Sequence, residues 1–233
     1  MLKPDGDASS HWREQLQTAS AALGLGLNAS ALDGLIAYLQ LLRRWNKVYN
    51  LTALRDPQEM LTHHLVDCLA VLPALRQHAV NAGLDGLRML DVGSGGGLPG
   101  VVLALAQPAW RVSCVDTVSK KASFIRQVAA ELRLPNLTGL HARVEALAPQ
   151  AGQFDVITSR AFASLVDFTT LSAQVLAPGG VWLAMKGKLP SDEQAQLPAG
   201  VQVFHVEQLQ VPGVDAQRCL VWMRPAAHPN IAA

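Results

Sequence analysis

The feature that most constrains this chain is a glycine-rich segment over residues 89–100, which reads MLDVGSGGGLPG. An apolar run ends at Asp91, glycines then turn the chain, and Pro99 suits the first turn of a following helix. Glycine lets the backbone pass close to a ligand and adopt positive φ without a Cβ clash. A strand, a glycine turn and a helix in this order predict a ligand-binding loop of the Rossmann type.

Two ligand classes fit the loop. The spacing Gly95-x-Gly97-x-x-Gly100 matches the dinucleotide fingerprint, and by itself that match is weak. Asp91 favours S-adenosylmethionine, because a carboxylate directly before the loop repels a pyrophosphate but attracts the ammonium of a methionine moiety. Asp116 ends the next apolar run, where it can accept hydrogen bonds from both ribose hydroxyls, a role that both ligand classes use. We therefore expect a methyl donor, with Asp91 as the discriminating residue.

Short apolar runs alternate with helical patterns from about residue 85 onward. Such alternation predicts a parallel sheet covered by helices on both faces. The last two runs, 201–210 and 219–224, have no helix between them and predict an antiparallel hairpin at one edge. The expected fold class is α/β, a Rossmann-like, mostly parallel seven-stranded sheet with an antiparallel edge hairpin, in a donor-binding domain over residues 85–233.

The first 84 residues precede this alternation. Residues 1–11 are rich in Pro, Gly, Asp and Ser and are predicted to be a disordered tail. Residues 12–84 carry helical periodicity and are predicted to form a small helical module. Ser30, with Asp33 three residues later, is the expected N-cap of its longest helix.

Net charge and residue composition limit which partners the chain is expected to bind. The formal net charge is +1, so an RNA partner would need a local basic patch, because affinity depends on the phosphates contacted and not on total charge.

The three cysteines are far apart, and His63 and Asp67, one helical turn apart, lack further ligands, so we expect no metal site. Neither a signal peptide nor a membrane-spanning run is evident. We expect a cytoplasmic monomer with no membrane partner.

Four segments carry a resemblance to a known family: 45–52 (WNKVYNLT), 91–100, 143–145 (RVE) and 159–163 (SRAFA). They resemble the bacterial glucose-inhibited division protein B family, the 16S ribosomal RNA guanine-N7 methyltransferases. The resemblance runs from about residue 32 to residue 224. It implies methylation, by S-adenosylmethionine, of guanine N7 in the 530 loop of the small-subunit RNA, in the region of position 527.

Site residues follow by position. The resemblance assigns Val144 and Glu145 to the two sides of the adenine and gives Arg160 a place at the donor. Together with the loop, the expected donor-binding residues are Asp91, Gly93, Gly95, Leu98, Asp116, Val144, Glu145 and Arg160.

The expected acceptor atom needs little chemistry from the protein. N7 of guanine carries a lone pair and no proton, so we assign no acid or base, and catalysis would consist of positioning the reactants in line. Basic side chains beside the predicted strand ends are the candidates for RNA contacts, namely Lys47, Lys120, Arg143, Arg160, Lys186 and Lys188.

Two alternatives stay open on sequence grounds. The modest net charge is compatible with a methyltransferase that acts on a small metabolite. A nonenzymatic RNA-binding or nucleotide-binding module is also compatible, because fold does not determine function.

Overall fold

The fold is built around one β-sheet. The computed structural model describes residues 6–147, 153–160, 164–188 and 191–226. Its seven strands lie in the order β3-β2-β1-β4-β5-β7-β6. Their bounds are β1 (Arg88–Val92), β2 (Arg111–Asp116), β3 (Leu137–His141), β4 (Phe154–Arg160), β5 (Leu176–Lys186), β6 (Val201–Leu209) and β7 (Arg218–Pro225). The first five strands pair in parallel, and β7 is antiparallel to both β5 and β6. The mostly parallel sheet with an antiparallel edge pair is thus confirmed.

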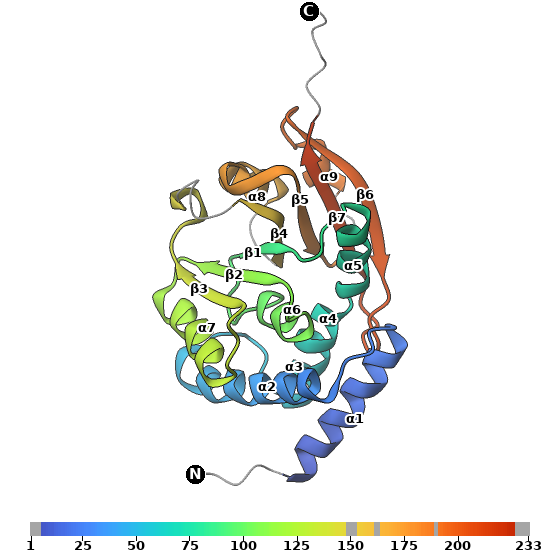
Figure 1. Ribbon diagram of the computed structural model, residues 1–233, viewed down its shortest axis with the longest axis vertical. Coiled ribbons are helices and arrows are strands. Elements are labelled where there is room, and N and C mark those ends of the chain that lie inside the picture. The colour runs from blue at the N-terminus through green and yellow to red at the C-terminus, as the bar shows by residue number, and fades with distance from the viewer. Residues whose placement is uncertain (1–5, 148–152, 161–163, 189–190, 227–233) are drawn as a thin grey trace, which may run out of the picture.

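Helices cover both faces of the sheet (Figure 1). On one face lie α6 (Gly100–Ala106) and α7 (Ser119–Glu131), and on the other lies α8 (Leu165–Ser172). Short elements complete this half, namely the 3-10 turns η2 (Val144–Ala146) and η4 (Ala173–Val175) and the helix α9 (Ser191–Ala195). Two hydrophobic clusters fill the two faces, one with α6 and α7 and one with α8.

The N-terminal part is helical. It contains α1 (Gly6–Ala22), α2 (Ala29–Tyr49), α3 (Pro57–Met60), the π-helical stretch η1 (Leu61–Val66), α4 (Asp67–Leu69) and α5 (Leu72–Asn81). In Figure 1 these helices lie beneath α6 and α7 and, at α5, beside the β6–β7 pair. Buried side chains of α2 and α6 belong to one continuous cluster, so this part shares its core with the sheet.

The prediction of a disordered tail over residues 1–11 is wrong for residues 6–11, which form the start of α1. Trp12 and Leu16 are buried. The Ser9 hydroxyl accepts a hydrogen bond from Gln40 Nε2 of α2 at 3.1 Å. The composition of this segment did not indicate the first turn of α1, because a helix that packs through one narrow face needs few apolar residues in its first turn.

The prediction of Ser30 as an N-cap is also wrong. Asn28 is the N-cap of α2, with φ −77° and ψ 169°, and its side chain accepts a hydrogen bond from the Ala31 amide at 2.9 Å. Asn and Ser are both strong caps, so sequence preference alone does not choose between neighbouring positions. Leu25, just upstream of this cap, is buried.

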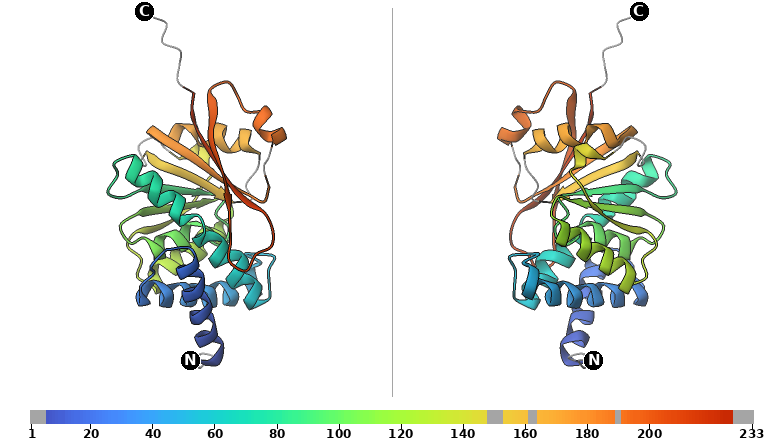
Figure 2. Two further views of the ribbon diagram at one scale, coloured as in Figure 1. Left: turned by 90° about the vertical axis from the view of Figure 1, so that its right-hand side faces the viewer. Right: turned by 90° about the vertical axis from the view of Figure 1, so that its left-hand side faces the viewer.

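The segment between β6 and β7 reaches back toward the helical part (Figures 1 and 2). A Cβ atom on Gly213 would lie 3.4 Å from Thr62 Cγ2 of η1, which is ordinary van der Waals contact. At the start of β7, Arg218 Nε donates a hydrogen bond to Asp67 Oδ1 of α4 at 2.7 Å. Among the described residues, no helix combines the length and apolar character that a membrane span requires.

Candidate donor site

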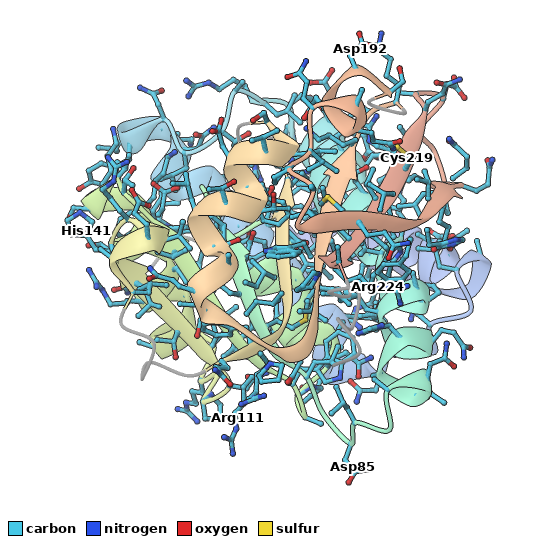
Figure 3. The ribbon with its side chains drawn as sticks, turned by 90° about the horizontal axis from the view of Figure 1, so that it is seen from above. Asp85, Arg111, His141, Asp192, Cys219 and Arg224 are labelled. Carbon is cyan, nitrogen blue, oxygen red and sulfur yellow. The ribbon has the colours of Figure 1, made fainter. Side chains whose placement is uncertain are left out.

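A cavity of about 530 Å³ opens at the carboxyl ends of the parallel strands. The strand order reverses between β1 and β4, and ligands of open α/β sheets bind at such a switch point. The loop after β1 forms one wall, and the ends of β4 and β5 and the start of β7 form another. Figure 3 separates the two sheet ends: Arg111, where β2 begins, and Asp85 lie at the bottom, while Cys219 of the cavity lies toward the opposite end. The helical part contributes Thr52, His63, His64 and Asp67.

The glycine loop has the backbone that its sequence predicts. Gly93, Gly95 and Gly97 have φ values of 66°, 57° and 88°, a region in which L side chains are strained. The amides of Gly93 and Ser94 both donate to the Val115 carbonyl, at 2.9 and 3.2 Å. The loop therefore bends across the end of β2, and Gly93, Gly95 and Leu98 line the cavity.

Asp91 lies below the loop and is fully buried. Its Oδ2 accepts a hydrogen bond from the Gly100 amide at 2.9 Å, at the start of α6. Its Oδ1 is buried and has no hydrogen-bond partner among the described residues. Burial raises the pKa of this carboxyl to about 7. A buried oxygen without a hydrogen-bond partner is destabilising, and an ammonium group that donated to it would remove that cost.

Asp116 closes the loop from the β2 side. Its Oδ2 accepts from the Gly95 amide at 3.0 Å and its Oδ1 accepts from the Val118 amide at 2.8 Å. Lys121 Nζ lies 3.6 Å from Oδ2. An ionised carboxylate has about four lone-pair sites, so capacity for ribose hydroxyls remains. Its present contacts hold the loop against the end of β2.

Val144 and Glu145 follow β3, next to the end of β2. Val144 is buried in the cluster that also contains Val115, and the backbone carbonyl of Glu145 accepts a hydrogen bond from the Gln174 side chain. Neither residue lines the 530 Å³ cavity, and neither do Asp91 and Asp116. The predicted donor residues therefore divide into a cavity group and a group at the ends of β2 and β3.

Arg160 is the last residue of β4, and it lines the cavity. Its Nη1 donates to the His63 carbonyl at 2.9 Å and to Asp67 Oδ2 at 3.2 Å. Asp67 Oδ1 in turn accepts from Arg218 Nε at 2.7 Å. A single carboxylate thus holds two guanidinium groups, so the three side chains together carry one uncompensated positive charge. We call Asp67, Arg160 and Arg218 the arginine clamp.

His64 stands beside the arginine clamp. Its Nδ1 lies 3.3 Å from Arg160 Nη2, and its Nε2 lies 2.7 Å from the Thr52 hydroxyl. Burial, assisted by the charge of Arg160, lowers the pKa of His64 to about 4. The imidazole is therefore neutral at physiological pH and adds no charge to the cavity wall.

Sequence reasoning missed Arg218 and assigned Asp67 no role. Asp67, one helical turn from His63, binds the two arginines, and the described residues include no group of three potential metal ligands. No local pattern connects residues 67, 160 and 218, because they meet only when three elements pack. The family segment at 45–52 ends at this wall, where the Thr52 hydroxyl contacts His64 and Asn46 Oδ1 accepts a hydrogen bond from the Thr52 amide.

Of the six basic residues proposed for RNA, two line the cavity and four do not. Arg160 and Lys186 line the cavity, and Lys186 Nζ is paired with Glu193 at 2.8 Å. Arg143 is paired with Glu145 but keeps most of its side chain exposed. The remaining three side chains, Lys47, Lys120 and Lys188, are exposed. Residues 161–163 of the fourth family segment lie outside the described residues.

Comparison with known proteins identifies the family. Residues 31–221 match the family described as rRNA small subunit methyltransferase G. The chain is 59% identical to the Ribosomal RNA small subunit methyltransferase G of Acidovorax sp. (strain JS42), over 94% of this chain and 98% of that protein. It is 57% identical to the protein of that name from Polaromonas naphthalenivorans (strain CJ2), over 92% of this chain and 96% of that one. The chain belongs to this family.

As a member of the methyltransferase G family, the chain is an enzyme, and S-adenosylmethionine is its methyl donor. Membership favours the ribosomal RNA methyltransferase predicted from the sequence over the small-metabolite alternative and over a nonenzymatic module.

Solved structures agree on the fold. The N-methyltransferase NodS from Bradyrhizobium japonicum WM9, in complex with S-adenosyl-L-homocysteine, superposes with a TM-score of 0.51 at 15% identity, over 82% of this chain and 99% of that one. A ribosomal protein L11 methylase from Lactobacillus delbrueckii subsp. bulgaricus has a TM-score of 0.50 at 17% identity, over 74% and 80%. These similarities confirm the Rossmann-like methyltransferase architecture.

Proposed function

We propose that the enzyme transfers a methyl group to N7 of a guanine in the 530 loop of 16S ribosomal RNA, acting as a monomer in the cytoplasm. The acceptor atom comes from the family resemblance. The observation that supports an RNA acceptor here is the cavity wall, in which Asp67 is the shared counterion of the two guanidinium groups of Arg160 and Arg218 and leaves a net positive charge that suits a polyanionic substrate.

The donor would lie between the glycine loop and the ends of β2 and β3. Gly93, Gly95 and Leu98 offer bare backbone and an apolar contact, and Asp91 Oδ1 offers an acceptor for the ammonium group. Asp116 would bind the ribose, while Val144 and Glu145 would flank the adenine. A volume of about 530 Å³ falls in the range of roughly 300–1,000 Å³ that is usual for ligand pockets.

The protein's part in the chemistry is placement. When bound, S-adenosylmethionine supplies a sulfonium methyl group that is attacked by the N7 lone pair as the carbon–sulfur electron pair returns to sulfur. Arg160 would orient the donor within the arginine clamp. The cavity walls would hold the base in line with the methyl carbon and exclude water. Since N7 carries no proton, no side chain has to accept one.

RNA contacts would come from the exposed side chains of Lys47, Lys120, Arg143 and Lys188, together with Arg160 and Lys186 in the cavity wall. Each phosphate contact releases counterions, so replacing Arg143 and Lys188 together by Ala should raise the KM for RNA and reduce its salt dependence. The affinity for the donor should change less. An unchanged salt slope would remove these two residues from the footprint.

The direct test of the substrate uses labelled donor and small ribosomal subunits. Label should appear as 7-methylguanine in the 530 loop, and it should be absent with free nucleosides or small metabolites. Label on another atom or another loop would contradict the proposed acceptor. Sedimentation of the purified enzyme at micromolar concentration should give the mass of one chain, and a dimer would contradict the proposed monomer.

A further inference from the structure

Helix α2 makes a polar contact with the glycine loop. Tyr38 lies in the middle of this helix and is fully buried. Its hydroxyl donates a hydrogen bond of 2.6 Å to the carbonyl oxygen of Gly96. Gly96 belongs to the part of the loop that lines the cavity. A residue far upstream of the donor-binding domain thus reaches the donor loop from beneath.

The helix and the loop are closely packed around this hydrogen bond. A Cβ atom on Gly96 would lie 2.9 Å from Leu42 Cδ1, one helical turn beyond Tyr38. On the same helix, Gly34 faces Leu105 of α6 with space for no larger side chain, since a Cβ there would lie 2.6 Å from Leu105 Cδ2. The loop therefore cannot move toward α2 without displacing core side chains.

The other anchors of the loop come from the sheet or from the loop itself. The Val115 carbonyl holds Gly93 and Ser94, and the Ser94 carbonyl accepts from the Gly97 and Leu98 amides. Asp116 holds Gly95. Within the described part of the chain, the Gly96 carbonyl is held by Tyr38. Loss of the hydroxyl would leave the apex of the loop without its anchor.

The same helix also contacts the element that follows β2. The Tyr38 ring lies 6.3 Å from the Phe124 ring of α7, and the Trp45 ring lies 5.3 Å from it. Helix α7 begins directly after Asp116 and Val118. Helix α2 thus supports both loops that would bind the donor, the glycine loop through a hydrogen bond and the Asp116 loop through aromatic packing.

We propose that Tyr38 is a positioning residue for methyl transfer: its hydroxyl holds the Gly96 carbonyl and so keeps the glycine loop in the conformation that binds the donor. This inference rests on the proposed placement of the donor at that loop. It makes the helical part of the chain a component of the donor site.

Tyr38→Phe tests the inference, because it removes the hydroxyl and keeps the ring. A neutral hydrogen bond contributes about 1 kcal/mol, which corresponds to roughly fivefold in an equilibrium constant. We expect isothermal titration calorimetry to show a dissociation constant for S-adenosylmethionine about fivefold higher than that of the wild type. The KM for the donor should rise similarly, while kcat at saturating donor and the KM for RNA should stay within twofold.

Two controls separate positioning from stability. Tyr49→Phe alters a tyrosine of the same helix that is 40% exposed, and it should leave donor binding unchanged. Leu16→Val removes one methylene from a buried side chain of α1 and should lower the urea midpoint while leaving donor affinity intact. An unchanged donor affinity in Tyr38→Phe, or an equal loss in Leu16→Val, would overturn the inference.

Asp116→Asn distinguishes this failure from failure of the donor site itself. If Asp116→Asn weakens donor binding and Tyr38→Phe does not, the donor lies at the loop and only the role of Tyr38 is wrong. If neither variant weakens binding, the placement of the donor is wrong, and the inference falls with it.

Discussion

Removing the carboxylate of the arginine clamp should cost more stability than its single charge suggests. Only 4% of the Asp67 side chain is exposed, against 21% for Arg160 and 24% for Arg218. Asp67→Ala would leave two guanidinium groups together with no counterion between them. The two arginines come from β4 and β7, so their repulsion would act where the helical part meets these two strands.

The magnitude follows from the bonds lost. A hydrogen bond to a charged group contributes about 1.5–3 kcal/mol, so two of them give roughly 3–6 kcal/mol. Partial exposure lets the arginines regain water, which favours the lower end, about 3 kcal/mol. With an m-value of about 3 kcal/mol/M for a chain of this size, the urea midpoint should fall by about 1 M.

Urea unfolding followed by circular dichroism measures this shift. The matched control is Asp33→Ala, which breaks the ion pair with Arg13, in which the side chains are 63% and 35% exposed. Exposed pairs contribute about 0.2–1 kcal/mol, so the control should move the midpoint by less than a third of a molar. A shift for Asp67→Ala no larger than that of Asp33→Ala would refute the reasoning.

Three further predictions concern the loop and its surroundings. Burial raises the pKa of Asp91 to about 7, so its carboxylate is lost as pH falls through 7. Donor affinity measured by calorimetry should therefore drop between pH 8 and pH 6, and Asp91→Asn should flatten this dependence; equal slopes would contradict it. The pKa of His64 is lowered to about 4, mainly by burial, whereas an unfolded histidine titrates near about 6.5. The unfolded state thus binds the proton first, stability should decline as pH falls from 6.5 toward 4, and His64→Gln should show a smaller decline in urea midpoint between pH 7.5 and pH 5. Gly97→Ala would place a Cβ against Val101 at a φ of 88°, so donor binding should be lost and the midpoint lowered; retention of both would show that the loop relaxes freely.

The donor loop was predictable because its signals are local. Glycines at 93, 95 and 97 adopt positive φ after a strand and before a helix, and neighbouring residues suffice to establish that geometry. The environment of Asp91 was not predictable in the same way. The sequence suggested an ammonium ligand at a strand tip, whereas the structure shows a fully buried carboxyl that also binds the first amide of α6.

In the helical part, less of the structure could be predicted from local sequence. Its periodicity revealed helices, but the first turn of α1 and the cap at Asn28 depend on packing against other elements. Asp67 looked like half of a metal site because a helix places residues 63 and 67 on one face. Its real partners, Arg160 and Arg218, lie 93 and 151 positions away along the chain.

The sequence by itself determined the succession of strands and helices along the chain, the antiparallel edge pair and the glycine loop. These features depend on side-chain alternation and on backbone freedom within a few residues. Only the tertiary structure decided which charges meet in the cavity and which residues support the loop. The arginine clamp and the hydrogen bond from Tyr38 to Gly96 join segments that lie far apart in the sequence. No local pattern in one segment indicates that it will contact the other. Such contacts arise when buried polar groups must find partners as the core closes, and that requirement acts across space and not along the chain.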